Sequence, residues 1–515
     1  MFEMDAILVL NFGGQYCHLI ARRIRDSGVY SEIVPNDMTI DGINDMKDRL
    51  NIKGIILSGG PLSIYEKDSP QMDKGIIRSG IPILGICYGH QLLAHYLNGK
   101  VVKAEKQEYG YSHAVIKSAK GIFSGLSKTE EVWMSHGDTV VSMPADSEIA
   151  ASTENCPVAA FASKGMKVFG VQWHPEVVHT KNGKLLLDNF IFGVCGAVQG
   201  WNPDKDVSEY TDMISGKVGK GNALIALSGG VDSSTAALLS SKSLGKRLTA
   251  VFIDTGLMRN NESEQVKNIA AKLGINLLCI DAGKNFLKAL KGVSDPEEKR
   301  KVIGREFIRE FEKVARDVNA DYLIQGTIYP DRIESGSIGK SSVIKTHHNV
   351  GGLPSDIKFK GVIEPLRDLY KDEVKKLALK LGMPKNMVYR QPFPGPGLAV
   401  RIIGSIDPEK IRILRRADAI IAYEAESSGF SDKLWQYFAV LTDIKSTGVK
   451  GDARTYGSVV AIRMVESTDA MTANFAKPPY ELLERISTRL TGEIPEVTRV
   501  VYDVTHKPPS TIEWE

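Results

Sequence analysis

The chain has 515 residues, of which 43% are hydrophobic and 25% are charged, and its formal net charge is +3. These values are typical of globular proteins, and a chain of this length is expected to form roughly two to four domains. The small net charge gives no general reason to expect a nucleic-acid or membrane partner, and no stretch approaches the ~20 apolar residues of a membrane span.

The N-terminal residues lack the pattern of a secretory signal peptide. The five cysteines are scattered and none has C-x-x-C spacing, which argues against a disulfide framework or a zinc site. We therefore expect a cytoplasmic enzyme that binds neither nucleic acid nor membranes.

The first segment, residues 1–200, alternates short β-type runs with helical stretches. The runs are AILVL (6–10), GIILS (54–58), IPILGI (81–86) and VFGVQW (168–173). Alternation of this kind predicts an α/β domain with a largely parallel sheet.

A sharp turn between a predicted strand and helix carries the sequence Gly85-Ile-Cys87-Tyr-Gly89. This is the small-x-nucleophile-x-small form of a nucleophile elbow, with cysteine in place of serine. The helix N-terminus behind Cys87 favours the thiolate, which is the reactive species. A buried structural cysteine is the alternative for a free thiol, but the two flanking glycines favour a nucleophile.

A cysteine nucleophile needs a base, and His174-Pro175-Glu176 supplies one together with a carboxylate that can orient it. Residues two apart in an extended chain project to the same side, so Glu176 can accept from His174. His90 lies one turn after Cys87 and competes, but a base on a separate element with its own carboxylate fits a triad better. The remaining histidines of this segment have no neighbouring carboxylate of this kind and are interpreted as packing or surface residues: His18, His95, His113, His136 and His179.

Gly59 and Gly60 end a predicted strand, where backbone N–H groups can face a developing oxyanion. GICYGHQ together with HPE resembles the class I glutamine amidotransferase family over residues 1 to about 200. The resemblance implies that glutamine is the substrate and ammonia the product. It also implies the roles of nucleophile for Cys87, base for His174 and orienting carboxylate for Glu176, with an oxyanion hole at Gly59 and Tyr88.

A charged passage with flanking Gly and Pro, residues 200–222, separates this segment from a second one, which we place at 201–395. Its β-type runs again alternate with helical stretches and predict a second parallel-sheet domain. They are ALIALSGG (223–230), TAVFIDTG (249–256), NLLCIDAG (276–283) and DYLIQGT (321–327). Residues 294–317 predict one long helix, with Asp295 as N-cap and Pro296 at its first position.

The sequence SGGVDSS (228–234) follows a predicted strand but lacks the G-K-[ST] of a Walker phosphate loop. Its backbone N–H groups, the hydroxyls of Ser228 and Ser233 and the following helix N-terminus can still bind a pyrophosphate. Asp232 can hold Mg²⁺, and such a site suits attack on the α-phosphate of ATP with departure of pyrophosphate. A Ser/Gly turn that only caps a helix is the structural alternative.

The complete SGGVDSS resembles the PP-loop of the N-type ATP pyrophosphatases. The resemblance implies that ATP is a co-substrate, that Mg²⁺ is bound at Asp232, and that the whole loop contacts ATP: Ser228, Gly229, Gly230, Val231, Asp232, Ser233 and Ser234.

The pattern changes again after RQPFPGPGLAVR (390–401). Residues 396–515 combine amphipathic helices with β-type runs such as SVVAIRMVES (458–467) and TRVVYDVT (498–505), which predicts a smaller α+β domain. These apolar runs can form a homodimer interface or face the core of their own domain.

The order of the three segments and six further stretches resemble the glutamine-hydrolysing GMP synthase family over essentially the whole chain. The stretches are QGTIYPDRIES (325–335), KTHHNVGGLP (345–354), EPLRDLYKDEV (364–374), RQPFPGPGLAVR (390–401), GDARTYGSVVAIR (451–463) and KPPSTIEWE (507–515). The resemblance implies amination of xanthosine 5′-monophosphate (XMP) to GMP through an adenylated intermediate, with ATP consumed to AMP and pyrophosphate. It further implies a homodimer formed through the C-terminal domain, and contacts to XMP from Arg300, Gln436, Lys507 and Glu513.

Several points stay open at this level. Six residues are cationic or can become so, and each can meet a phosphate or be solvated surface: Arg300, Arg332, Lys345, His347, His348 and Arg401. Gln391 stands where some relatives have histidine, which leaves its role unassigned.

A synthetase with another acceptor, such as deamido-NAD, and a catalytically silent scaffold are the alternative functions. Residues 507–515 would ordinarily fray, but Lys507 and Trp514 predict a tail packed at the nucleotide site.

Overall fold

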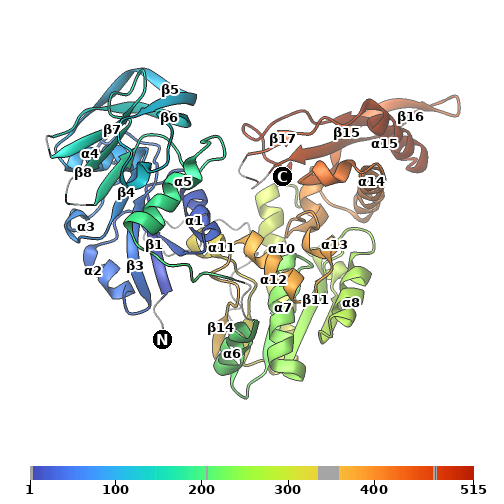
Figure 1. Cartoon of the computed structure of the whole chain (residues 1–515). Helices are drawn as coiled ribbons and strands as arrows, with labels where there is room; N and C mark the ends of the chain where they lie inside the picture. Colours follow the sequence, from blue (N-terminus) through green and yellow to red (C-terminus); the bar gives the residue numbers. More distant parts are fainter. Residues whose placement is uncertain are drawn as a thin grey trace. The chain divides into compact units, whose positions relative to one another are not determined.

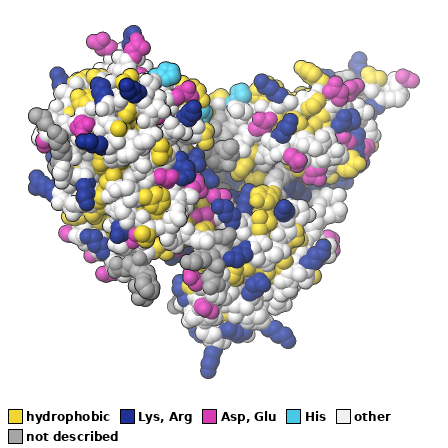
Figure 2. All heavy atoms as spheres, viewed as in Figure 1, with side chains coloured by type: hydrophobic (Ala, Val, Ile, Leu, Met, Phe, Trp, Pro, Cys, Tyr) yellow, Lys and Arg dark blue, Asp and Glu magenta, His cyan; other side chains and the backbone are white. Residues whose placement is uncertain are grey.

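The computed structural model describes residues 4–144, 146–163, 165, 167–203, 207–334, 359–467, 470 and 472–515. These residues form two compact units that divide near residue 202 (Figure 1). The stretch KTHHNVGGLP, with Lys345, His347 and His348, lies outside the described residues. Acidic and basic side chains are interspersed over the face seen in Figure 2, as the small net charge suggests.

The N-terminal unit is built on a nine-stranded sheet with the order β2-β1-β3-β4-β9-β8-β7-β5-β6. Its strands are β1 (Met4–Asn11), β2 (Tyr30–Pro35), β3 (Leu50–Leu57), β4 (Ile83–Ile86), β5 (Lys100–Ile116), β6 (Thr129–Ser142), β7 (Ser147–Ser152), β8 (Ala160–Ser163) and β9 (Val168–Val171). The half from β2 to β9 is parallel, and the other strands pair antiparallel.

The predicted parallel sheet is therefore present, and an antiparallel half extends it. β1 is buried on both faces, as is usual for a parallel strand covered by helices, whereas β5 alternates between buried and exposed residues. The helical segments are α1 (Cys17–Asp26), α2 (Ile40–Met46), α3 (Gly75–Arg78), α4 (Tyr88–Tyr96), η1 (Gly121–Phe123), α5 (Gly183–Asp188) and η2 (Asn189–Val194).

The C-terminal unit begins with the second predicted parallel sheet, in the order β12-β11-β10-β13-β14. The strands are β10 (Ala223–Ala226), β11 (Leu248–Asp254), β12 (Leu277–Asp281), β13 (Tyr322–Ile324) and β14 (Gly361–Ile363). The helices of this part are α6 (Val207–Val218), α7 (Val231–Leu244), η3 (Gly245–Arg247), α8 (Glu262–Lys272), α9 (Gly283–Ala289), α10 (Pro296–Asp317), α11 (Tyr329–Glu334), α12 (Lys371–Lys380) and α13 (Lys385–Val388).

Helix α10 begins as its sequence predicts. The Asp295 side chain accepts from the Glu298 N–H at 2.8 Å, and Pro296 occupies the first position, where a missing N–H costs nothing. Among the described helices, none is long and apolar enough to cross a membrane.

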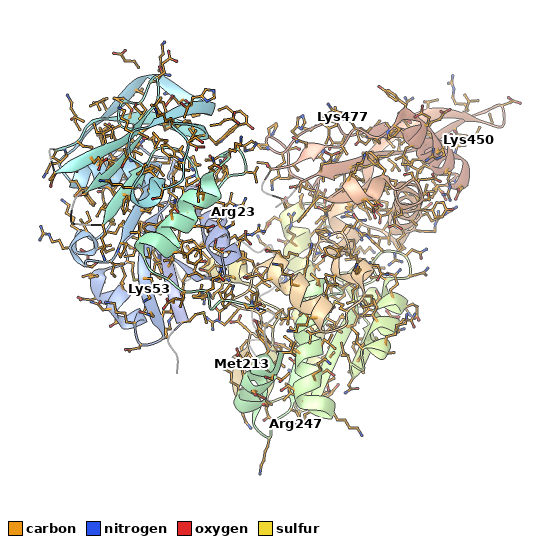
Figure 3. The ribbon with its side chains drawn as sticks, in the orientation of Figure 1. Arg23, Lys53, Met213, Arg247, Lys450 and Lys477 are labelled. Carbon is orange, nitrogen blue, oxygen red and sulfur yellow. The ribbon has the colours of Figure 1, made fainter. Side chains whose placement is uncertain are left out.

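The remainder of the unit has the predicted α+β composition. It contains η4 (Gly397–Arg401), α14 (Pro408–Ser427), η5 (Phe430–Lys433), β15 (Gln436–Lys450), β16 (Ala453–Glu466), β17 (Asn474–Phe475), α15 (Tyr480–Glu493) and β18 (Val497–Tyr502). β15 and β16 form a long antiparallel hairpin, and Lys450 at its far end is labelled in Figure 3. One hydrophobic cluster runs from Leu224 and Phe286 in the parallel-sheet part to Ile462 and Leu490 here. The division into two domains at 395–396 stays a prediction, because these parts share a core.

Residues 507–515 are packed rather than frayed. Lys299 of α10 is fully buried, donates to the Ile402 carbonyl at 2.6 Å and forms an ion pair with the Glu515 side chain. Ile512 is 7% exposed, and the Trp514 indole N–H donates to Asp503 at 2.9 Å. The tail is therefore held against its domain, although Trp514 is 39% exposed, and its predicted place at the nucleotide site stays a prediction.

We expect Lys299→Met to release the tail, because it removes a buried cation and leaves the Glu515 carboxylate without its partner. Breaking one side of a buried pair costs about 3–5 kcal/mol, so amide hydrogen exchange in 507–515 should accelerate at least about tenfold. Mass-spectrometric exchange measures this directly. Lys301→Met, an exposed position on the same helix, is the control and should leave exchange unchanged. Equal exchange in both variants would contradict the role of Lys299.

Candidate active sites

Cys87 occupies the turn between β4 and α4 in a strained backbone conformation, with φ 54° and ψ −106°. Such a conformation is rare for a residue with a side chain and is found at functional turns. A Cβ on Gly85 would lie 2.5 Å from the Gly89 carbonyl carbon, and one on Gly89 would lie 2.6 Å from the Leu57 oxygen. The two glycines that flank the cysteine are thus required by backbone packing.

The structure brings His174 and Glu176 together with this cysteine. His174 Nδ1–H donates to Glu176 Oε1 at 2.7 Å, and Cys87 lies close enough to His174 to raise the pKa of its imidazole. Burial opposes protonation of His174, yet the Glu176 carboxylate and Cys87 hold its pKa well above the ordinary value. The side chain of Glu176 is fully buried, and its Oε2 accepts no hydrogen bond from the described residues. The arrangement suits an imidazolium beside a thiolate.

Strand β6 frames the cysteine and the histidine. The Ser135 carbonyl accepts from Cys87 Sγ at 3.5 Å, and the Trp133 carbonyl accepts from the His174 N–H at 3.0 Å. From α1, Arg23 (labelled in Figure 3) donates through Nε to the Glu176 carbonyl at 2.9 Å. Cys87 from the β4–α4 turn and His174 and Glu176 from the loop after β9 are therefore held by hydrogen bonds with α1 and β6.

Gly59 lies beside the same centre. A Cβ at this position would be 3.3 Å from His174 Cε1 and 3.7 Å from Cys87 Cβ. A Cβ on Gly60 would be 2.8 Å from the Phe12 carbonyl oxygen, so this glycine is needed for packing. Tyr88 is the first residue of α4, and its N–H has no acceptor within the helix. The oxyanion-hole roles of Gly59 and Tyr88 stay predictions, and the geometry is compatible with them.

The competing base His90 is fully buried. Its Nε2 lies 3.0 Å from the Val158 carbonyl, and burial lowers its pKa to about 3. It is a packed, neutral side chain that does not accept a proton at neutral pH.

The interpretation of His136 as a residue without a carboxylate partner is wrong. Its Nε2 lies 3.1 Å from Glu108 Oε2, and both side chains are buried. The two residues are 28 positions apart and meet only through the pairing of β5 with β6, so no local spacing could reveal them.

In the C-terminal unit, SGGVDSS forms the predicted turn between β10 and α7. Gly229 has φ 78°, Gly230 is the N-cap of α7, and the Ser228 and Ser233 hydroxyls lie 2.9 Å apart. The loop after β13 packs on this turn so closely that a Cβ on Gly326 would lie 2.9 Å from Ser233 N. Backbone N–H groups, two hydroxyls and a helix N-terminus thus gather at the carboxyl end of a parallel strand.

Asp232 has a free ligand atom. Its Oδ2 lies 3.5 Å from Lys371 Nζ, while Oδ1 is buried and accepts no hydrogen bond from the described residues. Burial raises the pKa of Asp232, and Lys371 counteracts this. The carboxylate fits a hard cation such as Mg²⁺, but the described residues contain no group of three or more His, Cys, Asp or Glu side chains for a metal. A cation here would need phosphate oxygens as further ligands.

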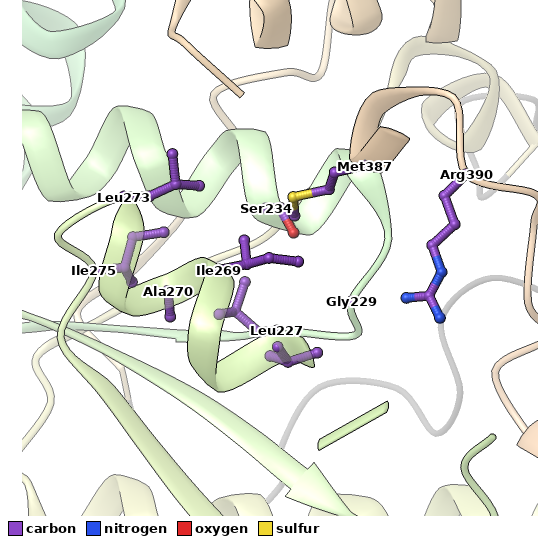
Figure 4. Close-up of a pocket in the computed structure, with 10 residues that line it drawn as sticks. Leu227, Gly229, Ser234, Ile269, Ala270, Leu273, Ile275, Met387 and Arg390 are labelled. Atoms are coloured by element: carbon purple, nitrogen blue, oxygen red, sulfur yellow. The ribbon is translucent and has the colours of Figure 1, made fainter. Parts of the chain in front are cut away.

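An apolar pocket adjoins this turn and is shown in Figure 4. Its lining includes Leu227, Ile269, Leu273 and Met387, and the charged Arg390 is paired with Glu262 through Nη2 and Oε2 at 2.9 Å. The lining is unsuited to phosphate, so the pocket adds no anion site to the loop.

Two of the four predicted XMP contacts meet. Gln436 Nε2 donates to Glu513 Oε1 at 3.2 Å. Glu513 is also held by the buried Arg401 through Nε at 3.0 Å and Nη2 at 2.8 Å. Arg401 lies over the Phe438 ring, 3.9 Å from its centroid. This guanidinium, which the sequence left as either a phosphate contact or solvated surface, is therefore a buried partner of the tail.

The other two predicted XMP contacts, Lys507 and Arg300, bond to other partners than Gln436 and Glu513. Lys507 Nζ donates to the Ala470 carbonyl at 2.7 Å, and Arg300 lies 3.9 Å from Glu297. Arg332 pairs with Asp368 at 2.8 Å, so this further cationic candidate is engaged in an ion pair.

Gln391 forms a hydrogen bond between two segments of the C-terminal unit. Its Oε1 accepts from the Tyr437 N–H at 3.0 Å, which ties the loop after α13 to the start of β15.

Family models match three parts of the chain. These are glutamine amidotransferase class-I over residues 8–194, NAD synthase over 207–317 and GMP synthase C terminal domain over 423–514. Fold and site thus define a class I glutamine amidotransferase joined to an ATP pyrophosphatase of the NAD synthase kind.

Relatives matching the full length are named "GMP synthase [glutamine-hydrolyzing]". The protein of Caldicellulosiruptor saccharolyticus is 51% identical over 100% of both chains. That of Aeropyrum pernix is 52% identical over 100% of this chain and 99% of its own. That of Aquifex aeolicus is 51% identical over 99% of each. The chain belongs to the family of glutamine-hydrolysing GMP synthases.

We expect Glu176→Gln to slow alkylation of Cys87 by iodoacetamide at pH 7 by about tenfold. Loss of the carboxylate lowers the pKa of His174, so the imidazolium that stabilises a thiolate is less populated. Peptide mass spectrometry distinguishes Cys87 from the other four thiols. Burial raises the pKa of Cys17 and Cys195 to about 12, that of Cys156 to about 11, and also raises that of Cys279, which slows their alkylation.

Peptide mass spectrometry measures this rate over a range of increasing pH. The difference between the variant and the unaltered protein should shrink at alkaline pH, because the thiolate then forms without the imidazolium. Glu131→Gln, an exposed carboxylate of β6, is the control. An unchanged rate in Glu176→Gln would show that the carboxylate does not govern the charge of His174.

Proposed function

We propose that the chain converts XMP to GMP, using ammonia released from glutamine at Cys87 and ATP cleaved to AMP and pyrophosphate at residues 228–234. The observation that carries the glutamine half is the contact of His174 with both Cys87 and Glu176. Membership of the glutamine-hydrolysing family supports the acceptor.

In the glutaminase half, the Cys87 thiolate attacks the side-chain amide carbon of glutamine. The carbonyl π electrons move to oxygen, where the N–H groups of Gly59 and Tyr88 stabilise the charge. His174 then gives its proton to the nitrogen, the C–N bond breaks and ammonia leaves. His174 takes a proton from water, hydroxide attacks the thioester and glutamate departs, while Glu176 holds the imidazole in place throughout.

In the synthetase half, the C2 oxygen of XMP attacks the α-phosphorus of ATP and the bond to pyrophosphate breaks. The loop 228–234 binds the departing phosphates through N–H groups and the Ser228 and Ser233 hydroxyls. Mg²⁺ held by Asp232 would supply charge neutralisation for the phosphates. Ammonia then adds to C2 and AMP leaves with the oxygen, because AMP is a far better leaving group than the original oxygen. Arg300, Gln436, Lys507 and Glu513 are proposed to bind XMP.

Deamido-NAD is the rival acceptor, and the NAD synthase match over 207–317 gives it a specific basis. That match covers only part of the ATP pyrophosphatase segment, whereas the GMP synthase relatives cover both chains almost completely. A catalytically silent scaffold is disfavoured, because the triad geometry and the free Asp232 oxygen would serve no structural purpose.

We also propose a homodimer formed through the C-terminal domain of a cytoplasmic enzyme. The β15–β16 hairpin exposes apolar side chains that fit such an interface: Ile444 at 62%, Val449 at 75% and Tyr456 at 74%. A second copy would cover them.

The acceptor is tested by incubating the protein with ATP, Mg²⁺ and glutamine, together with XMP or deamido-NAD, and measuring AMP. We expect AMP and GMP in equal amounts with XMP and no amidated product with deamido-NAD. Product formation from deamido-NAD alone would establish the rival acceptor, and no AMP with either would favour the scaffold.

Cys87→Ala should abolish synthesis from glutamine and leave synthesis from ammonium chloride intact, because the thiolate acts only in the glutaminase half. The ratio of the two rates in a GMP assay measures the separation. Cys279→Ala, which removes a partly buried thiol of the other unit, is the control. Loss of both activities in folded Cys87→Ala protein would refute the two-site scheme.

Asp232→Asn should reduce AMP formation at least about a hundredfold with either nitrogen source, since the neutral amide is a poor ligand for a hard cation. Asp212→Asn, an exposed carboxylate on α6, is the control. If Asp232→Asn keeps its ammonia-dependent rate at every Mg²⁺ concentration, the residue serves only the start of α7.

A further inference from the structure

A buried cluster around Glu108 lies in the N-terminal unit outside the proposed triad. Glu108 is 7% exposed, and its carboxylate accepts from Ser112 Oγ at 3.2 Å and from Thr153 Oγ1 at 3.0 Å. His136 Nε2 approaches the same carboxylate at 3.1 Å. Three donors around one buried carboxyl group favour its ionised form. Although burial raises the pKa of Glu108, the bonds from His136 and Thr153 hold it below the ordinary value.

The partners of His136 determine its charge. Nδ1 lies 2.8 Å from the Asp138 carbonyl, which can only accept, so this nitrogen carries a proton. Nε2 faces an ionised carboxylate, which also can only accept, so it carries a proton as well. Both ring nitrogens of His136 thus face acceptors, an arrangement that suits an ion pair with Glu108, and both side chains are almost completely buried.

The pair lies where the backbone ladder between β5 and β6 is interrupted. Lys103 is opposite Asp138 and Glu108 is opposite His136, so residues 104–107 bulge out against Gly137. A strand next to such an irregularity has lost the backbone bonds that fix its register. The Glu108–His136 bond restores a cross-strand link at the first pair after the bulge.

The same short piece of β6 contacts the glutaminase centre. The Ser135 carbonyl accepts from Cys87 Sγ at 3.5 Å. The Asp138 carbonyl accepts from Gln91 Nε2 at 2.9 Å, and Gln91 lies on α4, the helix that begins after Cys87. A shift of β6 would therefore move the carbonyl groups that hold both the nucleophile and its helix.

We propose that Glu108 and His136 are positioning residues for glutamine hydrolysis: their buried ion pair locks β6 in register, so that its carbonyl groups fix Cys87 and α4. The proposal rests on the proposed glutaminase centre. Neither residue takes part in bond making, and the synthetase half is independent of them.

Glu108→Gln is the variant of choice, because it keeps the shape and removes the charge. Glutamine-dependent kcat/KM should fall about 10- to 100-fold, the size expected for a small misplacement of catalytic groups, while the ammonia-dependent rate stays unchanged. Thr153→Val, which removes one donor to Glu108, should give a smaller loss of the same kind and serves if Glu108→Gln does not fold.

Glu32→Gln is the matched control. Glu32 is also a buried carboxylate in an ion pair, with Arg49 at 2.9 Å, but lies on β2 at the opposite edge of the same sheet. It should alter neither activity. If Glu32→Gln lowers the glutamine-dependent rate as much as Glu108→Gln, the effect is general destabilisation and the proposal is overturned.

A spectroscopic readout separates a charged positioning pair from ordinary packing. In full-length protein labelled with ¹⁵N-histidine, both ring nitrogens of His136 should resonate as protonated at pH 7, and one should lose its proton in Glu108→Gln. His136→Gln assigns the signals. A neutral His136 in the unaltered protein would overturn the ion pair, whereas an undiminished glutamine-dependent rate in Cys87→Ala would instead refute the glutaminase centre.

Discussion

Close backbone packing at two strand-to-helix turns is the constraint on which both sites depend. At the first turn, a Cβ on Gly85 or Gly89 would come within 2.6 Å of neighbouring backbone atoms. At the second, a Cβ on Gly326, in the loop after the neighbouring strand β13, would come within 2.9 Å of Ser233. Because only hydrogen fits at these glycines, α4 starts directly against the end of β4, and the loop after β13 packs directly on the start of α7. The N–H groups of the helix start then face the same space as the reactive or binding side chains.

Two buried cations organise the C-terminal unit. The side chains of Lys299 and Arg401 are fully excluded from solvent, and each is paired with a carboxylate of the tail, Glu515 and Glu513 respectively. A buried charge without its partner costs several kcal/mol, so the tail is held by electrostatics as much as by the burial of Ile512. The position of Glu513 next to Gln436 is consequently a property of the whole tail and its buried partners.

The sequence predicted the parts of this structure that depend on local pattern. The cap of α10 at Asp295, the strands that precede Cys87 and Ser228, and the i, i+2 pairing of His174 with Glu176 all follow from spacing of a few residues. The antiparallel half of the first sheet and the bond between Glu108 and His136 depend on strand register, which spacing does not report. The burial of Arg401 and Lys299 could not be predicted from the sequence either. An isolated cation in a sequence resembles a solvated surface residue until its buried carboxylate partner is known.

A loop that lacks the Walker lysine can still serve a polyanion, because the cation is supplied from elsewhere in the fold. Lys371, at the start of α12, lies 3.5 Å from Asp232, and its side chain is 46% exposed. Burial alone would favour protonation of Asp232, but Lys371, joined by the nearby Lys375, opposes this and favours the ionised carboxylate. The Asp232 carboxylate in turn reduces the positive potential that the neighbouring N–H groups and lysines create at the loop. The loop thus combines neutral donors, one carboxylate ligand and a half-exposed cation from another helix. That charge distribution suits a phosphate chain accompanied by a divalent ion better than a phosphate chain alone.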